Sequence, residues 1–225
     1  MGKLYGVSVG AGDPELITLK AVKIVEKCAV LAVPRTDGGK SLALEIVRKI
    51  LDLSDKKIIY FDFPMVRDRL ILEKNYNRIS EIICGKLSGN DVAFLNLGDI
   101  SIYSTFGYIA ERVRKKGFEV EICAGVTSFC AVSATVGRPL VSDGKMLHII
   151  PYNAEKLRKT DFSEGTYIIM KCGKHLIELV EILNEKGLAD KAYAVENCGL
   201  ENERIFRNIG EISDCGYFTV VIVEV

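Results

Sequence analysis

Near the start of the chain, apolar positions form two patterns that are typical of strands, with a helical pattern between them. Residues 3–9 alternate apolar with small or polar side chains, and residues 29–33 form one continuous apolar run. The first pattern is typical of a strand, and the second indicates a strand buried on both faces. Between them, residues 18–27 repeat apolar side chains at three-residue spacing, which predicts an amphipathic helix.

The same alternation continues as far as residue 123. Periodicity predicts strands at residues 3–9, 29–33, 57–61, 91–97 and 119–123. It predicts helices at residues 18–27, 41–51, 69–87 and 106–116. Strands that alternate with helices form a mostly parallel sheet with helices on its faces. We therefore expect an N-terminal α/β domain over residues 1–123.

The order of elements changes after Cys123. The pattern predicts helices near residues 127–136 and 175–186, and strands at 146–150, 166–170, 191–196, 204–208 and 217–224. The last two strands follow each other without room for a helix, and we expect a short turn to join them. This arrangement predicts a second α/β domain with a mixed sheet over residues 124–225.

Composition excludes several classes of protein. Thirty Lys and Arg residues balance thirty Asp and Glu residues, so bulk charge indicates neither a nucleic-acid nor a membrane-surface partner. The longest apolar stretches are far too short to span a bilayer, and the first residues lack the regions of a signal peptide. We expect a soluble, cytoplasmic protein with no membrane partner.

Cysteine and histidine usage indicates no disulfide framework and no metal site. The seven cysteines are odd in number, scattered, and mostly embedded in apolar runs, which is typical of buried, reduced thiols. No C-x-x-C occurs, and His148 and His175 are not spaced as a metal pair. We therefore expect no metal bound by the protein itself.

Three glycine-bearing loops follow predicted strands: residues 10–14, 97–105 and 124–128. In an open α/β sheet, ligands bind beyond the carboxyl ends of the strands. The first loop is neither G-x-G-x-x-G nor a phosphate-binding loop, and a tight turn that needs glycine explains it equally well. Asp99 in the second loop is placed either to accept ribose hydroxyls or to form a capping Asx turn.

Together these loops favour a ligand that is nucleoside-like but carries no phosphate. The first loop contains no Lys or Arg to meet a phosphate. S-adenosylmethionine (SAM) fits, because its ribose needs an acid, its carboxylate needs backbone N–H groups, and its sulfonium is a cation. None of these groups needs a basic side chain.

Several motifs resemble those of the tetrapyrrole methyltransferases, the SAM-dependent family of cobalamin and sirohaem synthesis. The chain reads SVGAGDPELITLKA, GDISIYST and AGVTSF, and a Glu-Asn pair follows at Glu196. Within the family, the stretches KLYGVSVGAGDPELITLKAV, DFPM, LNLGDISIYSTFGYI and GVTSFCAVSATVGRPL resemble the precorrin-2/cobalt-factor II C(20)-methyltransferases most. Ser8 replaces a family glycine, and Ala11, Ile100 and Ala124 stand where prolines are usual.

The resemblance implies two α/β domains with SAM in the cleft between them, and a homodimer. It implies methyl transfer to the C(20) meso carbon of precorrin-2 or cobalt-factor II, with cobalt present only as part of the substrate. Position by position, it implies that the residues contacting SAM are Ala11, Leu97, Gly98, Asp99, Ile102, Thr127, Ser128, Met170 and Cys198. For Met170 and Cys198, the residues alone indicate a core side chain and a buried thiol.

Catalysis by this family places few demands on side chains. Methyl transfer from a sulfonium depends on orientation and on exclusion of water. Tyr103 is the candidate for orienting the substrate or relaying the proton that leaves the meso carbon; packing is the alternative role. Basic residues should meet the substrate's carboxylates, although most of them serve equally well as surface charges. The candidates are Arg35, Lys40, Arg67, Arg69, Arg138 and Lys145.

Two other functions remain open at this stage. A relative could methylate another corrin carbon or a diphthine precursor on a protein, using the same SAM motifs. A non-catalytic nucleotide-sensing module could use the same loops without turnover. Assay on candidate tetrapyrroles distinguishes all three.

Overall fold

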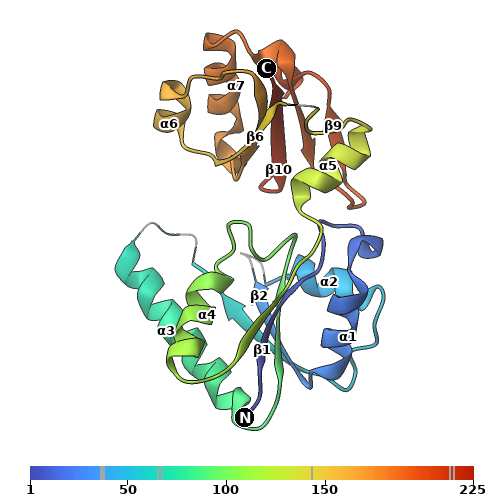
Figure 1. Ribbon diagram of the computed structural model, residues 1–225, viewed down its shortest axis with the longest axis vertical. Helices are drawn as coiled ribbons and strands as arrows, with labels where there is room; N and C mark the ends of the chain where they lie inside the picture. The colour runs from blue at the N-terminus through green and yellow to red at the C-terminus, as the bar shows by residue number, and fades with distance from the viewer. Residues whose placement is uncertain (36–38, 65, 67, 143, 213, 215) are drawn as a thin grey trace. The chain divides into compact units, whose positions relative to one another are not determined.

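The computed structural model describes residues 1–225 except residues 36–38, 65, 67, 143, 213 and 215. The chain divides into two compact units, Met1–Thr127 and Ser128–Val225 (Figure 1). Each unit contains one sheet with its own helices. The sequence analysis placed the domain boundary between residues 123 and 124. That the two units are two separate domains stays a prediction.

The sheet of the first unit has five strands, all parallel. Its order is β3-β2-β4-β1-β5, and every neighbouring pair runs in the same direction. The strands are β1 (Leu4–Ser8), β2 (Val30–Arg35), β3 (Lys57–Asp62), β4 (Val92–Asn96) and β5 (Val120–Cys123). The predicted parallel sheet is confirmed.

Helices cover both faces of this sheet. The elements between the strands are a 3-10 turn (Pro14–Leu16), α1 (Leu19–Lys27), α2 (Leu42–Arg48), α3 (Arg69–Leu87) and α4 (Phe106–Lys115). Because side chains alternate across a strand, Val7 and Leu95 pack with α1 and α2, whereas Phe94 packs with α3 and α4. At Gly6 a Cβ would lie 2.5 Å from the Phe106 ring, so glycine lets α4 lie close against β1.

Side-chain caps fix where these helices begin. Thr18 Oγ1 accepts a hydrogen bond from Ala21 N at 3.1 Å, and Ser41 Oγ accepts one from Leu44 N at 3.4 Å. Asp68 Oδ1 accepts from the first turn of α3. These N-caps satisfy amide groups that have no partner within a helix, and they set the lengths of the loops after β1, β2 and β3.

The second unit contains a mixed sheet of five strands in the order β6-β7-β10-β8-β9. The strands are β6 (Met146–Pro151), β7 (Gly165–Met170), β8 (Ala192–Glu196), β9 (Arg204–Phe206) and β10 (Thr219–Glu224). β6 and β7 are parallel, and β10 is antiparallel to both β7 and β8. The predicted mixed sheet is confirmed.

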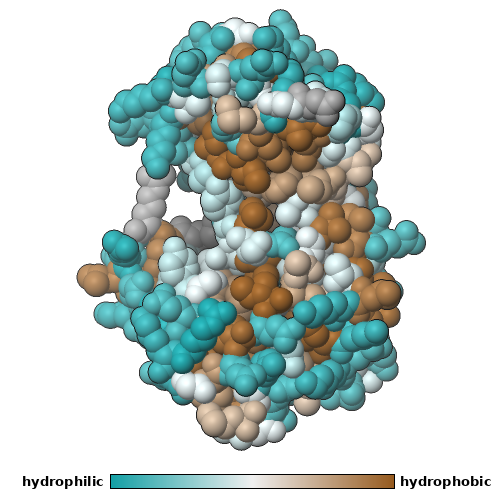
Figure 2. All heavy atoms as spheres, viewed as in Figure 1, coloured by the Kyte–Doolittle hydropathy of each residue, from teal (hydrophilic) through white to brown (hydrophobic). Residues whose placement is uncertain are grey.

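The second unit also has helices, one of which the periodicity missed. They are α5 (Ser128–Val136), α6 (Ala154–Lys159) and α7 (Leu176–Glu185), with 3-10 turns at Gly173–His175, Ala189–Lys191 and Ile209–Glu211. Only Leu157 of α6 is buried, so that helix has almost no apolar periodicity. Figure 2 shows hydrophobic side chains gathered on one face of this unit, and its exposed large apolar residues include Met146, Ile205 and Tyr217.

The predicted short turn between the last two strands is wrong, because residues 207–218 separate β9 from β10 and include the 3-10 turn Ile209–Glu211. β9 pairs with β8, and β10 lies between β7 and β8 instead of forming a hairpin with β9. Burial explains the difference: β10 is buried over Thr219–Val223, whereas Arg204 and Ile205 of β9 are exposed. An apolar strand gains most at the centre of a sheet, and a short, partly charged one fits an edge. Within the described part of the chain, no helix has the length and apolar character needed to cross a membrane.

Candidate active site

The strand order of the first unit places a topological switch point between β1 and β4. The chain leaves β1 through α1, on one face of the sheet, and leaves β4 through α4, on the other. Loops therefore diverge at the carboxyl ends of these neighbouring strands, where open α/β sheets bind ligands. Here Gly98 N donates to Gly10 O at 2.6 Å, which joins the first two predicted loops.

Asp99 joins the second loop to the third. Its Oδ2 accepts a hydrogen bond from Gly125 N at 2.7 Å, and its Oδ1 accepts from Ser101 N at 2.8 Å and from Ser101 Oγ. Burial acts to raise the pKa of Asp99, but the hydrogen bonds from Ser101 and Gly125 outweigh it and hold that pKa below its usual range. Asp99 is thus an ionised carboxylate that connects two loops. A ribose that binds Asp99, as predicted, would have to use the same two oxygens that already accept the hydrogen bonds from Ser101 and Gly125.

Ser8 holds the same loop from the β1 side. This side chain is fully buried, and its Oγ accepts a hydrogen bond from Ile100 N at 2.9 Å. A Cβ on Gly125 would lie 2.4 Å from the Ser8 Cβ, so the third loop passes directly over Ser8. The sequence showed Ser8 only as a replacement for a family glycine. Its partner, 92 residues away, is known only from the fold.

Two amide groups of the first loop remain available to a ligand. Gly10 and Gly12 have φ of 80° and 127°, conformations that suit glycine. Among the described residues, no protein acceptor receives a hydrogen bond from the N–H groups of Ala11 and Gly12. A buried amide without a partner is rare, and Ala11 is only 9% exposed. These amides are the donors that an anionic group such as an amino-acid carboxylate would use.

The remainder of the second loop is tied to β4 through Asn96. Ser104 Oγ donates to Asn96 Oδ1 at 2.7 Å and accepts from Phe106 N at 3.1 Å, while Asn96 Nδ2 donates to Leu97 O at 2.7 Å. The sequence analysis did not single out Asn96 or Ser104. The sequence did place a side-chain amide and a hydroxyl at the two ends of a glycine turn, and this could have predicted the hydrogen bond between them.

The structure places six predicted residues on or beside these joined loops: Ala11, Leu97, Gly98, Asp99, Ile102 and Thr127. The predicted catalytic residue Tyr103 follows Ile102 and is 40% exposed. Ser128, Met170 and Cys198 belong to the second unit. Within it, Met170 ends β7, and Cys198 lies two residues beyond β8 with its Sγ 3.5 Å from Thr135 Oγ1 of α5.

Backbone strain marks both groups of predicted residues. Among the described non-glycine residues, three have positive φ: Tyr103 at 49°, Lys171 at 61° and Asn197 at 51°. Each is next in sequence to a predicted cofactor residue, namely Ile102, Met170 or Cys198. Such conformations persist where the surroundings impose them, and they concentrate at functional sites. Sequence patterns gave no sign of this strain.

Glu196, at the end of β8, is committed to its own unit. It is 4% exposed, its Oε2 accepts from Arg204 Nε, and its Oε1 accepts from Gly216 N. Arg204 also donates to Asp214 Oδ1 at 3.0 Å. The Glu196 carboxylate therefore fastens β8 to β9 and to the segment before β10.

The predicted substrate-binding cations have different surroundings. Arg35 donates to both oxygens of Asp62, at 3.0 and 2.6 Å, so its guanidinium is already paired. Lys145 lies 3.5 Å from Glu164. Lys40 is exposed, Arg69 begins α3, and Arg67 lies outside the described residues. Arg138 lines a pocket of the second unit.

The thiols differ from the expectation at one position. Cys28, Cys84, Cys123, Cys172 and Cys198 are buried, whereas Cys130 is exposed on α5. Cys215 lies outside the described residues. Burial raises the pKa of Cys28 to about 12. No group of three or more His, Cys, Asp or Glu side chains in the described chain is arranged to hold a metal ion.

Comparison with curated proteins finds relatives along most of the chain. The chain is 36% identical to a probable cobalt-precorrin-2 C(20)-methyltransferase of Methanocaldococcus jannaschii, over 82% of this chain and 78% of the relative. It is 30% identical to the cobalt-precorrin-2 C(20)-methyltransferase of Salmonella typhimurium, over 99% and 96%. A precorrin-2 C(20)-methyltransferase of a Sinorhizobium species is 29% identical, over 99% and 95%.

Solved structures share the fold. The uroporphyrin III C-methyl transferase of Thermus thermophilus in its native form has a TM-score of 0.75 at 20% identity and covers 99% of this chain and 97% of its own. The same enzyme complexed with S-adenyl homocysteine has a TM-score of 0.74, covering 99% and 92%. The family model of the Tetrapyrrole (Corrin/Porphyrin) Methylases matches residues 3–213, and the chain belongs to this family.

Proposed function

We propose that this protein transfers a methyl group from SAM to the C(20) meso carbon of precorrin-2 or of cobalt-factor II. Two relatives at 36% and 30% identity carry names for C(20) methylation of cobalt-precorrin-2, and a third at 29% carries the name for precorrin-2. These names support the position of methylation. They leave both metal states of the substrate as candidates.

The observation that carries the cofactor proposal is the joining of three loops at the carboxyl ends of β1, β4 and β5. The Ala11 and Gly12 amides have no described acceptor, Asp99 supplies negative charge, and residues 10–14, 97–105 and 124–128 contain no Lys or Arg. Free amides suit a carboxylate, and the absence of cationic side chains suits a sulfonium. This set of donors and the ionised Asp99 fit SAM.

We assign the cofactor contacts to Ala11, Leu97, Gly98, Asp99, Ile102, Thr127, Ser128, Met170 and Cys198. The left-handed residues beside Ile102, Met170 and Cys198 support this assignment, because strained backbone concentrates at ligand sites. When bound, SAM supplies an electrophilic methyl group. The protein's part is to orient the reactants and exclude water.

Tyr103 is our candidate for a catalytic role. Its backbone is held at a φ of 49°, and its side chain remains 40% exposed. A side chain that orients the substrate or relays its proton must be accessible to the substrate. We expect Tyr103→Phe to lower kcat by roughly 100-fold, the lower end of the range for a lost general acid or base, with KM for SAM unchanged. An unchanged kcat would assign Tyr103 to packing.

The test is anaerobic turnover of methyl-labelled SAM with metal-free precorrin-2 and cobalt-factor II in parallel, reading the label in the tetrapyrrole. Label at C(20) of either substrate supports the proposal and identifies the preferred metal state. Binding of SAM without transfer to either compound refutes the C(20) assignment. Other corrin carbons, a protein substrate or a non-catalytic sensor then become the candidates to assay.

We also propose, from the family resemblance, that the protein is a cytoplasmic homodimer and that its two units are its two domains. Sedimentation equilibrium at micromolar concentration measures the assembly: twice the chain mass of 24.9 kDa supports the dimer, and a single chain mass contradicts it. Limited proteolysis tests the domains, since separate domains are expected to yield fragments that end near residue 127.

A further inference from the structure

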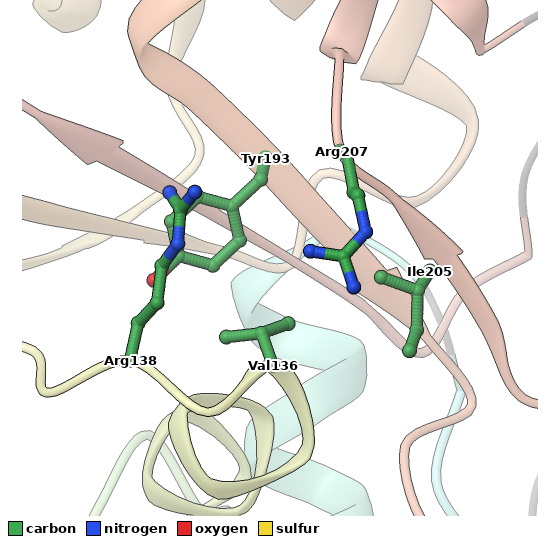
Figure 3. A pocket seen from close by; sticks show the side chains of 5 residues that line it. All are labelled: Val136, Arg138, Tyr193, Ile205 and Arg207. Atoms are coloured by element: carbon green, nitrogen blue, oxygen red, sulfur yellow. The ribbon is translucent and has the colours of Figure 1, made fainter.

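A small pocket in the second unit lies where the end of α5 meets β8 and β9. Val136, Arg138, Tyr193, Ile205 and Arg207 line it (Figure 3). Its volume is about 20 Å³, which admits one carboxylate oxygen, and the pocket is open, so a larger group would extend out through its mouth. Figure 3 shows the two guanidinium groups on either side, with the Tyr193 ring and the Val136 side chain between them. The pocket is therefore cationic at its sides and apolar at its floor.

The fold places these side chains together through sheet register and a helix end. Val195 pairs with Ile205 and Ala194 with Phe206, so the next pair in the same register is Tyr193 with Arg207. α5 ends at Val136, Gly137 follows with a φ of 70°, and Arg138 N then donates to Ser133 O at 3.1 Å. A left-handed glycine of this kind ends a helix and turns the chain sharply, which brings Arg138 over β8.

The two arginines differ in their existing partners. Arg138 Nη1 lies 3.7 Å from Glu224 Oε2, and its guanidinium carbon lies 5.6 Å from the Tyr193 ring centroid. No carboxylate of the described residues pairs with Arg207. Arg138 therefore has a nearby carboxylate, and Arg207 has none among the described residues.

Tyr193 supplies a third, unsatisfied polar group. Its residue is 5% exposed, and its hydroxyl has no hydrogen-bond partner of acceptable geometry within the described structure. Burial and the nearby Glu224 carboxylate raise the pKa of Tyr193 to about 12, so the phenol stays protonated and able to donate. A buried hydroxyl without a partner costs free energy, and a hydrogen bond to a ligand oxygen would remove that cost.

We propose that this pocket binds one carboxylate group carried on a short apolar stem. Guanidinium pairs bidentately with carboxylate, and no carboxylate in the described part of the chain competes for Arg207. Val136, Ile205 and the Tyr193 ring would contact the methylene groups of the stem, which favours a carboxylate over a fully hydrated phosphate. The carboxylate comes either from an acetate or propionate arm of a tetrapyrrole or from a free small carboxylic acid.

The experiment measures binding without any turnover. The full-length protein, labelled with ¹⁵N in its arginines, is titrated with sodium propionate, and sodium chloride of equal ionic strength serves as reference. We expect propionate, but not chloride, to shift the Arg138 and Arg207 Nε–H resonances. Arg207→Gln should weaken propionate binding about tenfold, as loss of a charge-assisted hydrogen bond predicts. Arg114→Gln, which changes an exposed arginine in the last turn of α4, in the other unit, is the matched control.

Two further variants separate the sources of the carboxylate. Tyr193→Phe should reduce propionate affinity while leaving both arginines in place. A raised KM for the tetrapyrrole in Arg207→Gln, with unchanged kcat and unchanged KM for SAM, assigns the carboxylate to the substrate. Propionate binding without that change in KM assigns it to a free acid. Arginine resonances that do not respond to 100 mM propionate any more than to chloride overturn the proposal, whatever the protein methylates.

Discussion

Substitution of Gly125 offers a sharp test of the joined loops, because one neighbour determines its cost. The backbone of Gly125 has no positive φ, so an alanine there meets no conformational barrier of its own. Its added Cβ would lie 2.4 Å from the Ser8 Cβ, with Gly98 O next at 3.2 Å. Ordinary carbon contacts lie at about 3.5–4.0 Å. Gly125→Ala therefore forces the third loop away from β1 by roughly 1 Å.

The expected free energies follow from these contacts. Overpacking at a buried site costs about 1–3 kcal/mol, which we expect for Gly125→Ala. Ser8→Gly removes the hydroxyl that accepts from Ile100 N, at a cost of about 1–3 kcal/mol, and glycine in a strand adds about 0.5–1 kcal/mol. In the double variant Ser8→Gly/Gly125→Ala the close contact is absent. Its destabilisation should therefore be smaller than the sum of the single costs by about 1–3 kcal/mol.

Ser8→Ala provides the matched control, because alanine keeps the Cβ and removes only the hydroxyl. Ser8→Ala/Gly125→Ala should therefore show additive costs. Urea denaturation followed by far-UV circular dichroism gives the free energies, and hydrogen exchange in peptides covering residues 92–105 assigns the change to the first unit. Additive costs in both double variants would refute the packing of Gly125 against Ser8. So would equal relief in both.

Three further predictions concern other buried groups. Asp99→Asn should destabilise the protein, with the full difference from wild type present above about pH 4. Because the pKa of Asp99 is lowered in the folded state, this difference should shrink as the pH falls through that lowered pKa. A difference in urea midpoint that does not change with pH would contradict the prediction. Iodoacetamide should modify the exposed Cys130 in the native protein and should modify the buried Cys28 only after unfolding, which peptide mass spectrometry measures. Modification of Cys28 in the native protein would refute its burial. Gly6→Ala should lower the free energy of unfolding by about 1–3 kcal/mol, because the new Cβ would meet the Phe106 ring. Gly6→Ala/Phe106→Leu should recover part of that loss in thermal unfolding, and no recovery would contradict the contact.

Much of the architecture could be predicted from periodicity. Continuous apolar runs for β2 and β4, and one-faced apolar spacing for α1 and α4, are local consequences of burial on two faces or one. α6 was missed, because a helix that buries only Leu157 has no such pattern. The short turn predicted between β9 and β10 was wrong: β9 pairs with β8 at the sheet edge and β10 lies at the centre, because strand order depends on which strand gains most from a central position and not on closeness in sequence.

The sequence by itself determined that three glycine loops follow strands, that the first carries no cation, and that their motifs are those of a methylase family. Only the tertiary structure decided which groups those loops contact. Asp99 meets Gly125, Ser8 meets Ile100, and Tyr193 lies opposite Arg207 because parallel crossovers and strand register join segments distant in sequence. Side-chain chemistry is written in the sequence, whereas a hydrogen bond or a pocket requires two positions in space that only the packed chain supplies.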